Sequence, residues 1–328
     1  MQWDSAQLEA LAAVVGEGSF DGAARLLHVT PSAVSQRIRA LENAAGGVLV
    51  RRTRPVTPTA PGETLLRLAR QTDLLAAEAA VELHASGLGP GPEGADGGPA
   101  APRPVSVPIA VNADSLATWV LPALARVPGV VLDIYREDQE RTVDLLPQGI
   151  VMAAITAQAE PVQGCTSRPL GVMPYRAMAT PRVVERWFPG GVTPEALSRA
   201  PMLVFDRHDD LQDQWLREYA ARTGSALPAP PRTYVPSTPE YLEAIRLGMG
   251  WGMVQDLRTG PVLSGDDVVL LDPRAPSVDV RLYLQQWRLR STTLDAVADA
   301  LLAEARRQLV HEGTRAAASP VSRGDRGR

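Results

Sequence analysis

The chain has 328 residues, which is too long for one small domain and predicts two or three. Hydrophobic residues make up 45% and charged residues 21%, an ordinary composition for a soluble protein. The net charge of −4 excludes a chain that is basic overall, so nucleic-acid binding would require a local basic patch. All 33 basic residues are arginine, a bias typical of a GC-rich genome, so arginine abundance alone does not indicate nucleic-acid recognition.

Cysteine usage and hydropathy limit the location of the protein. Cys165 is the only cysteine, which excludes an internal disulfide and fits a reducing compartment. The N-terminal residues lack a basic segment followed by an apolar run, and no stretch of about 18 apolar residues could span a membrane. We therefore expect a cytoplasmic protein with no membrane partner.

Three short helices are predicted first along the chain. Asp4 can cap a helix that extends to residue 16, with apolar residues recurring on one face. Ser19 can cap a second helix that ends near Leu27. Thr30 can cap a third, with Pro31 in its first turn, and two consecutive glycines at 46 and 47 end it.

The second and third helices have the pattern of a helix–turn–helix motif. Small residues at 23 and 24 suit a close helix crossing, and the third helix has a buried stripe at Val34, Ile38 and Leu41. Its opposite face carries side chains that can bind base edges or phosphates. Any surface helix also has such a polar face, so this pattern alone leaves DNA binding and a solvated face open. The candidate DNA contacts are Thr30, Pro31, Ser32, Ser35, Gln36, Arg37 and Arg39.

The segment "VLVRRTRPVT" predicts a short strand, an arginine-rich turn and a second extended piece. Arg51, Arg52 and Arg54 lie within four positions and suit phosphates or an A·T-rich minor groove. Residues 1–70 carry eight arginines against six acidic residues, a net charge of +2. This local excess of positive charge favours DNA binding over a merely solvated face.

A long amphipathic helix is predicted from Thr59 to about Ala85, and its length indicates a partner helix. The Gly-, Pro- and Ala-rich residues that follow predict a mobile linker. We therefore expect a winged helix–turn–helix domain at 1–59, a dimerisation helix at 60–86 and a flexible linker at 87–104.

Strands and helices alternate after the linker, which predicts an α/β domain with a mostly parallel sheet. Strands are expected at 105–111, 130–135, 150–156, 201–206, 233–235, 252–254 and 278–287. Helices are expected at 115–126, 139–148, 211–223, 239–247 and 294–309. The late strand and helix indicate a return to the first lobe. We expect an effector domain at 105–312, with lobe 1 at about 105–160 and 268–312, lobe 2 at about 161–267, and a disordered tail at 313–328.

In a two-lobed α/β domain, small ligands bind between the lobes, at strand ends and helix N-termini. Polar residues at such positions are Asn112, Asp114, Ser115, Thr156, Gln158, Ser237 and Thr238. Helix N-termini favour a carboxylate, but simple N-capping explains the serines and Thr238 equally well. Five acidic residues near the expected cleft could bind a cationic group or be solvated surface charges: Asp114, Asp206, Asp209, Asp210 and Glu240.

Residues 11–66 closely resemble the N-terminal winged helix–turn–helix of LysR-type transcriptional regulators. The matching residues are Gly18-Ser19-Phe20, Ala23-Ala24, Leu27, Ala33-Val34-Ser35, Ile38, Leu41-Glu42, Gly46, Leu49, Arg51, Arg54, Thr59 and Gly62. The resemblance implies a homodimer joined through the long helix, often a tetramer, and a two-lobed effector domain of the periplasmic-binding-protein type. The chain departs from the family at Pro61 and in its longer Gly/Pro linker.

The effector half is similar to the ArgP/LysG branch of that family, which responds to lysine or arginine and activates export of basic amino acids. The similar segments are "VNADSLATWVLPAL", "TAQAEPVQGC", "FDRHDDLQ", "VPSTPEY" and "GMGWGMVQ". The resemblance implies Ser115, Thr156 and Thr238 as candidates for the amino-acid carboxylate, and Asp114, Asp206 and Asp210 as candidates for the cationic end. His208 occupies the place of a family lysine.

We therefore expect a transcription regulator that binds double-stranded operator DNA, L-lysine or L-arginine, a second copy of itself and RNA polymerase. Two alternatives are a LysR-type regulator with a different or no effector and an architectural DNA-binding protein with a vestigial effector lobe. An enzyme is disfavoured because the sequence has no GxSxG, Walker, GxGxxG or HExxH motif. The four histidines do not cluster and Cys165 has no evident base, so we expect no catalytic residue, metal or cofactor.

Overall fold

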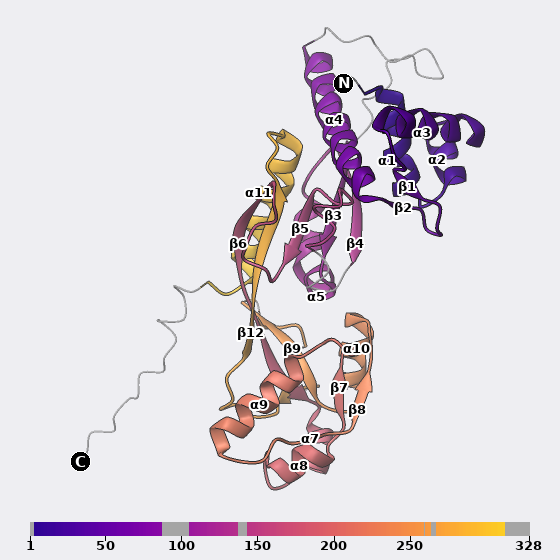
Figure 1. Cartoon of the computed structure of the whole chain (residues 1–328). Coiled ribbons are helices and arrows are strands. Elements are labelled where there is room, and N and C mark those ends of the chain that lie inside the picture. The colour runs from indigo at the N-terminus through magenta and orange to yellow at the C-terminus, as the bar shows by residue number, and fades with distance from the viewer. Residues whose placement is uncertain (1–2, 87–104, 137–142, 259, 264–266, 312–328) are drawn as a thin grey trace. The chain divides into compact units, whose positions relative to one another are not determined.

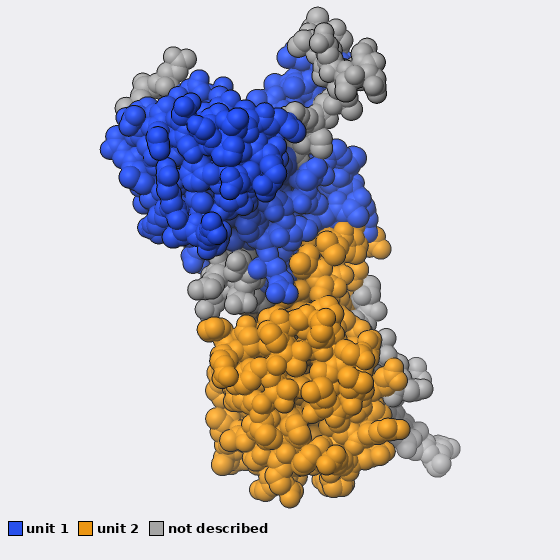
Figure 2. Space-filling view, turned by 90° about the vertical axis from the view of Figure 1, so that its right-hand side faces the viewer, with its two compact units in different colours: residues 1–112, 124–168, 284–300 blue, residues 113–123, 169–283, 301–328 orange. Residues whose placement is uncertain are grey.

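Figure 1 shows a computed structural model of the chain, which describes residues 3–86, 105–136, 143–258, 260–263 and 267–311. Its contacts divide the chain into two compact units, coloured separately in Figure 2. Unit 1 comprises residues 1–112, 124–168 and 284–300, and unit 2 comprises residues 113–123, 169–283 and 301–328. The predicted linker at 87–104 and tail at 313–328 lie outside the described residues.

The first part of unit 1 is a three-helix head with a two-stranded hairpin. Its elements are α1 (Ser5–Gly16), α2 (Phe20–Leu26), α3 (Pro31–Ala45), β1 (Val50–Arg51) and β2 (Thr57–Pro58). The three predicted N-caps are confirmed. Asp4, Ser19 and Thr30 accept hydrogen bonds from the backbone N–H three residues on, at 3.0, 3.0 and 3.2 Å.

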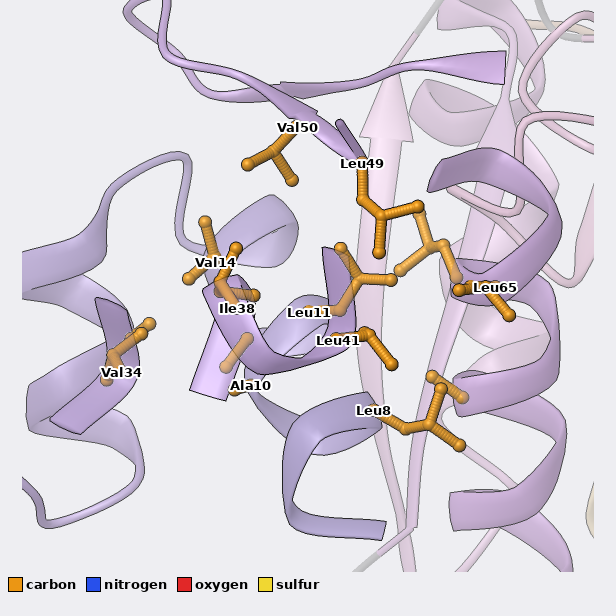
Figure 3. Packing of buried hydrophobic residues seen from close by; sticks show 14 of the residues in the cluster. Leu8, Ala10, Leu11, Val14, Val34, Ile38, Leu41, Leu49, Val50 and Leu65 are labelled. Carbon is orange, nitrogen blue, oxygen red and sulfur yellow. The ribbon is translucent and has the colours of Figure 1, made fainter. Parts of the chain in front are cut away.

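Leucine, isoleucine and valine side chains from several elements form the core of the head. Figure 3 shows the predicted α3 stripe together with α1 side chains and Leu65 of the following helix. Ala23 and Ala24 of α2 are also buried, as a close helix crossing requires. Each fully buried branched side chain contributes about 1.5–3 kcal/mol, so this cluster supplies most of the stability of the head.

The helix α4 (Ala60–Ala85) follows the hairpin, and Thr59 caps it through the N–H of Gly62. Pro61 lies in the first turn, where its missing N–H costs no hydrogen bond. The first half of α4 buries Leu65, Leu66 and Ala69 against the head. In the second half, Leu75, Val81 and Leu83 are exposed, so the proposed partner helix would have an apolar surface to cover.

The predicted parallel sheet is confirmed in unit 1. Strand β3 (Val105–Val111) lies between β4 (Val130–Arg136) and β5 (Ala153–Thr156), and both pairings are parallel. Because β3 is flanked on both sides, its residues from 107 to 111 are fully buried. The predicted helix at 115–126 forms as α5 (Ala113–Ser115), a π-helical turn (Leu116–Val120) and α6 (Leu121–Leu124).

The helix predicted at 139–148 is wrong in its described part. Residues 143–148 form turns, with hydrogen bonds from Leu146 N–H to the Val143 oxygen and from Gly149 N–H to the Leu146 oxygen. These bonds span three residues, and Pro147 has no N–H to extend an α-helix. Gly149 then adopts a φ of 74° close to the backbone of Arg67 in α4.

Unit 2 contains a second group of strands and helices. They are α7 (Pro181–Trp187), α8 (Pro194–Arg199), β7 (Met202–Val204), α9 (Leu211–Thr223), β8 (Arg232–Tyr234), α10 (Thr238–Arg246), β9 (Gly252–Leu257), β10 (Gly260–Pro261) and β11 (Val269–Leu270). Three long elements extend over a unit boundary: β6 (Cys165–Ala179), β12 (Val278–Trp287) and α11 (Thr292–Gln308). The strand order in the main sheet is β10-β9-β6-β12-β5-β3-β4, with β11 paired to β6. The β10–β9, β9–β6 and β11–β6 pairings are antiparallel, so the prediction of a mostly parallel sheet is wrong for these strands.

Strand β6 and helices α7 and α8 were not predicted from the sequence. Strand β6 contains Pro169, Gly171 and Pro174, which ordinarily argue against a strand. Gly171 has a φ of 140°, and a side chain there would meet Leu309 and Val310, so close packing of the chain explains the glycine. No helix in the part of the chain that the structure describes is long and apolar enough to cross a membrane.

Candidate functional site

The outer face of α3 presents the predicted DNA-contacting side chains. Ser32, Gln36 and Arg39 are exposed, while Ser35 and Arg37 are half-buried at its edges. The opposite face is fixed in the core through Val34, Ile38 and Leu41. Thr30 and Pro31 are exposed at the start of the helix, where the Thr30 hydroxyl caps Ala33 N–H. The face therefore combines a rigid backbone with polar side chains long enough to reach base edges.

The hairpin β1–β2 is attached to the helices by specific contacts. The Glu42 carboxylate accepts a hydrogen bond from Leu49 N–H at 3.0 Å, and the oxygen of Gly18 accepts one from Val56 N–H at 2.8 Å. The guanidinium of Arg52 lies 5.2 Å from the centroid of the Phe20 ring, a cation–π contact between hairpin and α2. The hairpin is thus held in a fixed position relative to α3.

The three hairpin arginines differ in their partners. Arg51 and Arg54 are exposed, and neither forms an ion pair within the described residues. Arg52 is exposed but stacks on Phe20, which makes it a positioning residue as well as a candidate DNA contact. Arg51 and Arg54 are therefore the freer cations for phosphate or minor-groove binding.

A second cluster of polar residues lies inside unit 2, around Asp114 of α5. The Tyr175 hydroxyl on β6 donates to Asp114 Oδ2 at 2.6 Å, and the Thr238 hydroxyl at the start of α10 donates to Asp114 Oδ1 at 2.8 Å. Burial and the Asp114 charge hold the pKa of Tyr175 well above its ordinary value, so this hydroxyl stays protonated and donates. Three segments distant in sequence therefore converge on one carboxylate.

Asp209 is electrostatically coupled to this cluster. Its carboxylate accepts hydrogen bonds from Phe205 N–H at 3.2 Å and from Leu211 N–H at 3.1 Å. Burial raises the pKa of Asp209, and the negative charge of Asp114 adds to the increase. The two negative charges therefore repel each other, and a nearby positive charge would reduce this repulsion.

This cluster has no cationic partner among the described residues. Asp114 and Asp209 form no ion pair with any arginine of the described residues. The side chains of Gln212 and Gln255 are buried, and the Oε1 atom of each has no hydrogen-bond donor among those residues. Gln212 Nε2 instead donates to the Tyr241 hydroxyl at 3.3 Å. Two half-buried carboxylates without a cationic partner and two buried amide oxygens without donors favour a ligand that brings positive charge and N–H groups.

Several other predicted effector residues have partners of their own. Asp210 forms an ion pair with Arg217 on the surface, and both side chains are largely exposed. Asp206 accepts hydrogen bonds from the N–H groups of His208 and Asp209 at 2.7 and 3.0 Å, which orders the turn before α9. The Ser237 hydroxyl donates to the exposed Glu240 carboxylate at the start of α10.

The predicted carboxylate contacts are distributed over both units. Asn112 and Thr156 are buried at the ends of β3 and β5 in unit 1, and Thr156 Oγ1 accepts a hydrogen bond from Gln158 N–H at 3.1 Å. Ser115 is buried next to Asp114 in unit 2. Sequence reasoning did not select Tyr175, Gln212 or Gln255, because each belongs to an element whose apolar neighbours dominate the pattern.

Two protein-family models match the chain and identify its family. Residues 5–63 match the bacterial regulatory helix-turn-helix protein model of the lysR family, and residues 105–306 match the LysR substrate binding domain. The chain belongs to the LysR family. The predicted fold class, a winged helix–turn–helix followed by a two-lobed α/β effector domain, is therefore confirmed for this LysR-family chain.

Named relatives show which branch of the LysR family this chain is similar to. The HTH-type transcriptional regulator LysG of Mycobacterium tuberculosis is 42% identical over 305 residues, covering 93% of this chain and 94% of the relative. The lysine export transcriptional regulatory protein LysG of Corynebacterium efficiens is 40% identical over 304 residues, covering 91% and 97%. The relatives are regulators, not enzymes, by name.

Two solved structures are similar over nearly the whole chain. ArgP from Mycobacterium tuberculosis has a TM-score of 0.74 and 39% identity, covering 95% of this chain and all of that one. Full-length LysG from Corynebacterium glutamicum with bound effector Arg has a TM-score of 0.66 and 35% identity, covering 94% and 99%. The resemblance to the ArgP/LysG branch is therefore confirmed.

Proposed function

We propose that the chain is a sequence-specific DNA-binding transcription regulator whose effector is L-arginine or L-lysine. The observation that carries the effector assignment is the coupled Asp114–Asp209 pair, which lacks a cationic partner in the described residues. The relatives support it, since one is named a lysine export regulator and a solved LysG contains Arg. A basic amino-acid exporter is the proposed target of regulation.

The proposed binding mode uses the two ends of the amino acid separately. The cationic side chain donates to Asp209 and Asp114, and its remaining N–H groups reach the Oε1 atoms of Gln212 and Gln255. Ser115 and Thr238, which lie in the same unit as Asp114 and Asp209, are the candidates for the α-carboxylate. Structural roles are favoured for Asp210, which forms a surface ion pair with Arg217, and for Ser237 and Glu240, which form a hydrogen bond with each other. Asp206 orders the turn before α9 and is also assigned a structural role.

At the other end of the chain, we propose that α3 enters the major groove and the hairpin arginines contact phosphates or the minor groove. The exposed apolar residues of α4 would pair with a second copy, giving a dimer or tetramer. RNA polymerase would be a further partner, and operator binding would place the protein with the nucleoid in the cytoplasm. No catalytic residue is part of this proposal.

The proposal is tested with the full chain and duplex DNA from upstream of its own gene. We expect that duplex to bind more tightly than a shuffled one at about 0.15 M salt, and arginine or lysine to change the affinity or the bend. Equal binding of both duplexes would refute sequence-specific regulation. Specific binding that no basic amino acid alters would support an architectural protein with a vestigial effector lobe instead.

Substitutions in α3 and in the hairpin are expected to affect DNA binding differently. Gln36→Ala should cost about 1–3 kcal/mol on the operator and little on random DNA, because the amide reads a base edge. Arg51→Ala or Arg54→Ala should weaken binding to the operator and to random DNA alike, because a phosphate contact is lost. The slope of log affinity against log salt concentration should become shallower by about 1. Fluorescence anisotropy over a salt series measures both effects.

Asn43→Ala provides the control on the same helix, since Asn43 is exposed in the last turn of α3, about two turns beyond Gln36, and is not one of the predicted contacts. It should leave both affinities unchanged. If Gln36→Ala reduces operator and random binding equally, this face of α3 only positions the helix.

The raised pKa of Asp209 predicts a pH dependence of effector stabilisation. A carboxyl group whose pKa is higher in the folded than in the unfolded state destabilises the fold as pH rises from the ordinary value through the raised one. Bound arginine compensates the charge of Asp209 and so removes this loss of folding stability. The increase in thermal midpoint caused by arginine should therefore grow with pH and level off above the raised pKa. A scan from about pH 4, near the ordinary pKa of an aspartate, to about pH 8 with and without arginine measures the difference.

The pKa of Asp73 in α4 is also raised, to about 6, by burial and by the charge of Glu9. Its titration changes the stability of the free and the liganded protein alike and therefore cancels in the difference. Asp209→Asn should flatten the pH profile of the arginine effect. An unchanged profile in that variant would show that another group is responsible.

A further inference from the structure

Unit 1 contains a cavity of about 200 Å³ outside both sites described above. One wall is a single face of α4, formed by Thr64, Arg67, Leu68 and Gln71 at positions i, i+3, i+4 and i+7. The facing wall consists of Gln163 and Gly164 before β6 and Trp287 at the end of β12. The cavity therefore lies where the helix that follows the DNA-binding head contacts the effector domain, entirely within one unit.

The polar side chains that line the cavity are exposed or half-buried, and most of them have no protein partner among the described residues. Arg67, Gln71 and Gln163 form no hydrogen bond or ion pair with any described residue. Thr64 is the exception, because its hydroxyl donates to the Ala60 oxygen within α4 at 3.4 Å. Trp287 donates its indole N–H to the Leu146 oxygen at 3.2 Å, so only its ring is available to a ligand. The unused donors on the lining are thus a guanidinium and two amide groups.

Two arginines lie at or beside the cavity. No acidic residue lines it, and Arg67 and Arg288 both act to lower the pKa of the neighbouring Cys165 thiol, which burial raises to about 11. Arg288 is held beside the cavity, since its backbone N–H donates to the Gly164 oxygen at 2.9 Å and its guanidinium donates to the Cys165 oxygen at 3.4 Å. This charge is opposite to that of the Asp114–Asp209 pair, so the two sites suit ligands of opposite sign.

We propose that this cavity binds a small organic carboxylate. The carboxylate would be held by the guanidinium of Arg67, which matches its planar geometry, and by the amide N–H groups of Gln71 and Gln163. The carbon part would contact Leu68 and the Trp287 ring. The volume is below the range of drug-sized pockets, which limits the ligand to a few carbon atoms. An amino acid with a net positive charge would be repelled.

The test compares butyrate with butyramide, which has nearly the same shape but no charge. Calorimetry on the full chain should detect saturable butyrate binding at millimolar concentrations and none of butyramide. Arg67→Gln should weaken butyrate binding at least tenfold. Arg25→Gln removes an exposed arginine from α2 and should leave the binding unchanged.

Three results would overturn the assignment. Equal binding of butyrate and butyramide would remove the charge requirement, and unchanged affinity in Arg67→Gln would place the ligand elsewhere. Tighter binding of inorganic phosphate than of butyrate would identify the site as one for phosphate rather than for a carboxylate. Gln71→Ala, which retains a good helix former, serves as a second variant if Arg67→Gln fails to fold. None of these measurements depends on the amino-acid effector or on DNA.

Discussion

Asp209→Asn is expected to weaken arginine binding by about a hundredfold, whereas Asp210→Asn leaves it unchanged. The two aspartates are adjacent, but Asp209 is half-buried and the charge of Asp114 raises its pKa, whereas Asp210 is exposed. Asp210 pairs with Arg217 at the surface, where an ion pair contributes little. Removing one charge of a buried ligand contact costs about 2–5 kcal/mol, because the partner cation is then desolvated without compensation.

Calorimetry with the two variants side by side measures this difference, and thermal unfolding of each checks the fold. Asparagine at 209 keeps one acceptor for the N–H groups of Phe205 and Leu211, so a modest loss of stability is expected. Asp114→Asn is a less clean substitution, because it also disturbs the hydrogen bonds from Tyr175 and Thr238. Equal loss of binding in Asp209→Asn and Asp210→Asn would contradict the assignment of the buried pair.

Gly62→Ala is expected to destabilise the DNA-binding head by about 3 kcal/mol. A Cβ atom on Gly62 would lie 1.9 Å from the backbone oxygen of Leu49, which is far inside van der Waals contact. That oxygen also accepts a hydrogen bond from Thr59 N–H at 2.9 Å, so it cannot move without breaking the join between hairpin and α4. Displacement of the hairpin should also weaken DNA binding.

Gly16→Ala is the matched control in the same head. Gly16 lies at the end of α1, and a Cβ atom there would have no neighbouring atom within 4 Å, so alanine should be neutral or slightly stabilising. Urea unfolding monitored by circular dichroism compares the two variants. A midpoint for Gly62→Ala equal to that of Gly16→Ala would show that the backbone at Leu49 adapts freely.

The local features of the head could be predicted from the sequence because short-range chemistry determines them. The caps at Asp4, Ser19 and Thr30 each depend on a side chain three residues from its donor. The buried stripe of α3 follows from helical periodicity alone. In each case the residues that interact are close in sequence, so no knowledge of the tertiary fold was needed.

The effector cluster could be predicted only in part, because it depends on contacts across long stretches of chain. Asp114 was selected from its position at a strand end, but its donors Tyr175 and Thr238 lie 61 and 124 residues away. Several aspartates of similar pattern precede and begin α9, and the sequence does not distinguish the buried Asp209 from the paired Asp210. Burial and ion pairing separate them, and both are tertiary properties.

In strand β6, the local sequence signals predict the wrong structure. Its prolines and Gly171 argue locally for a loop, yet pairing with β9 and close packing against Leu309 favour the extended conformation. Tyr175 is positioned by this strand. One of the three site residues that the sequence did not reveal therefore lies on the element that local propensity misassigned, whereas Gln212 and Gln255 lie on α9 and β9.

The most direct test of the central claim is a calorimetric comparison of L-arginine with L-citrulline. Citrulline keeps the length, shape and most N–H groups of arginine but has no side-chain charge. If the Asp114–Asp209 pair recognises a cation, arginine should bind at least about a hundredfold more tightly than citrulline. Comparable affinities for the two amino acids would contradict the account.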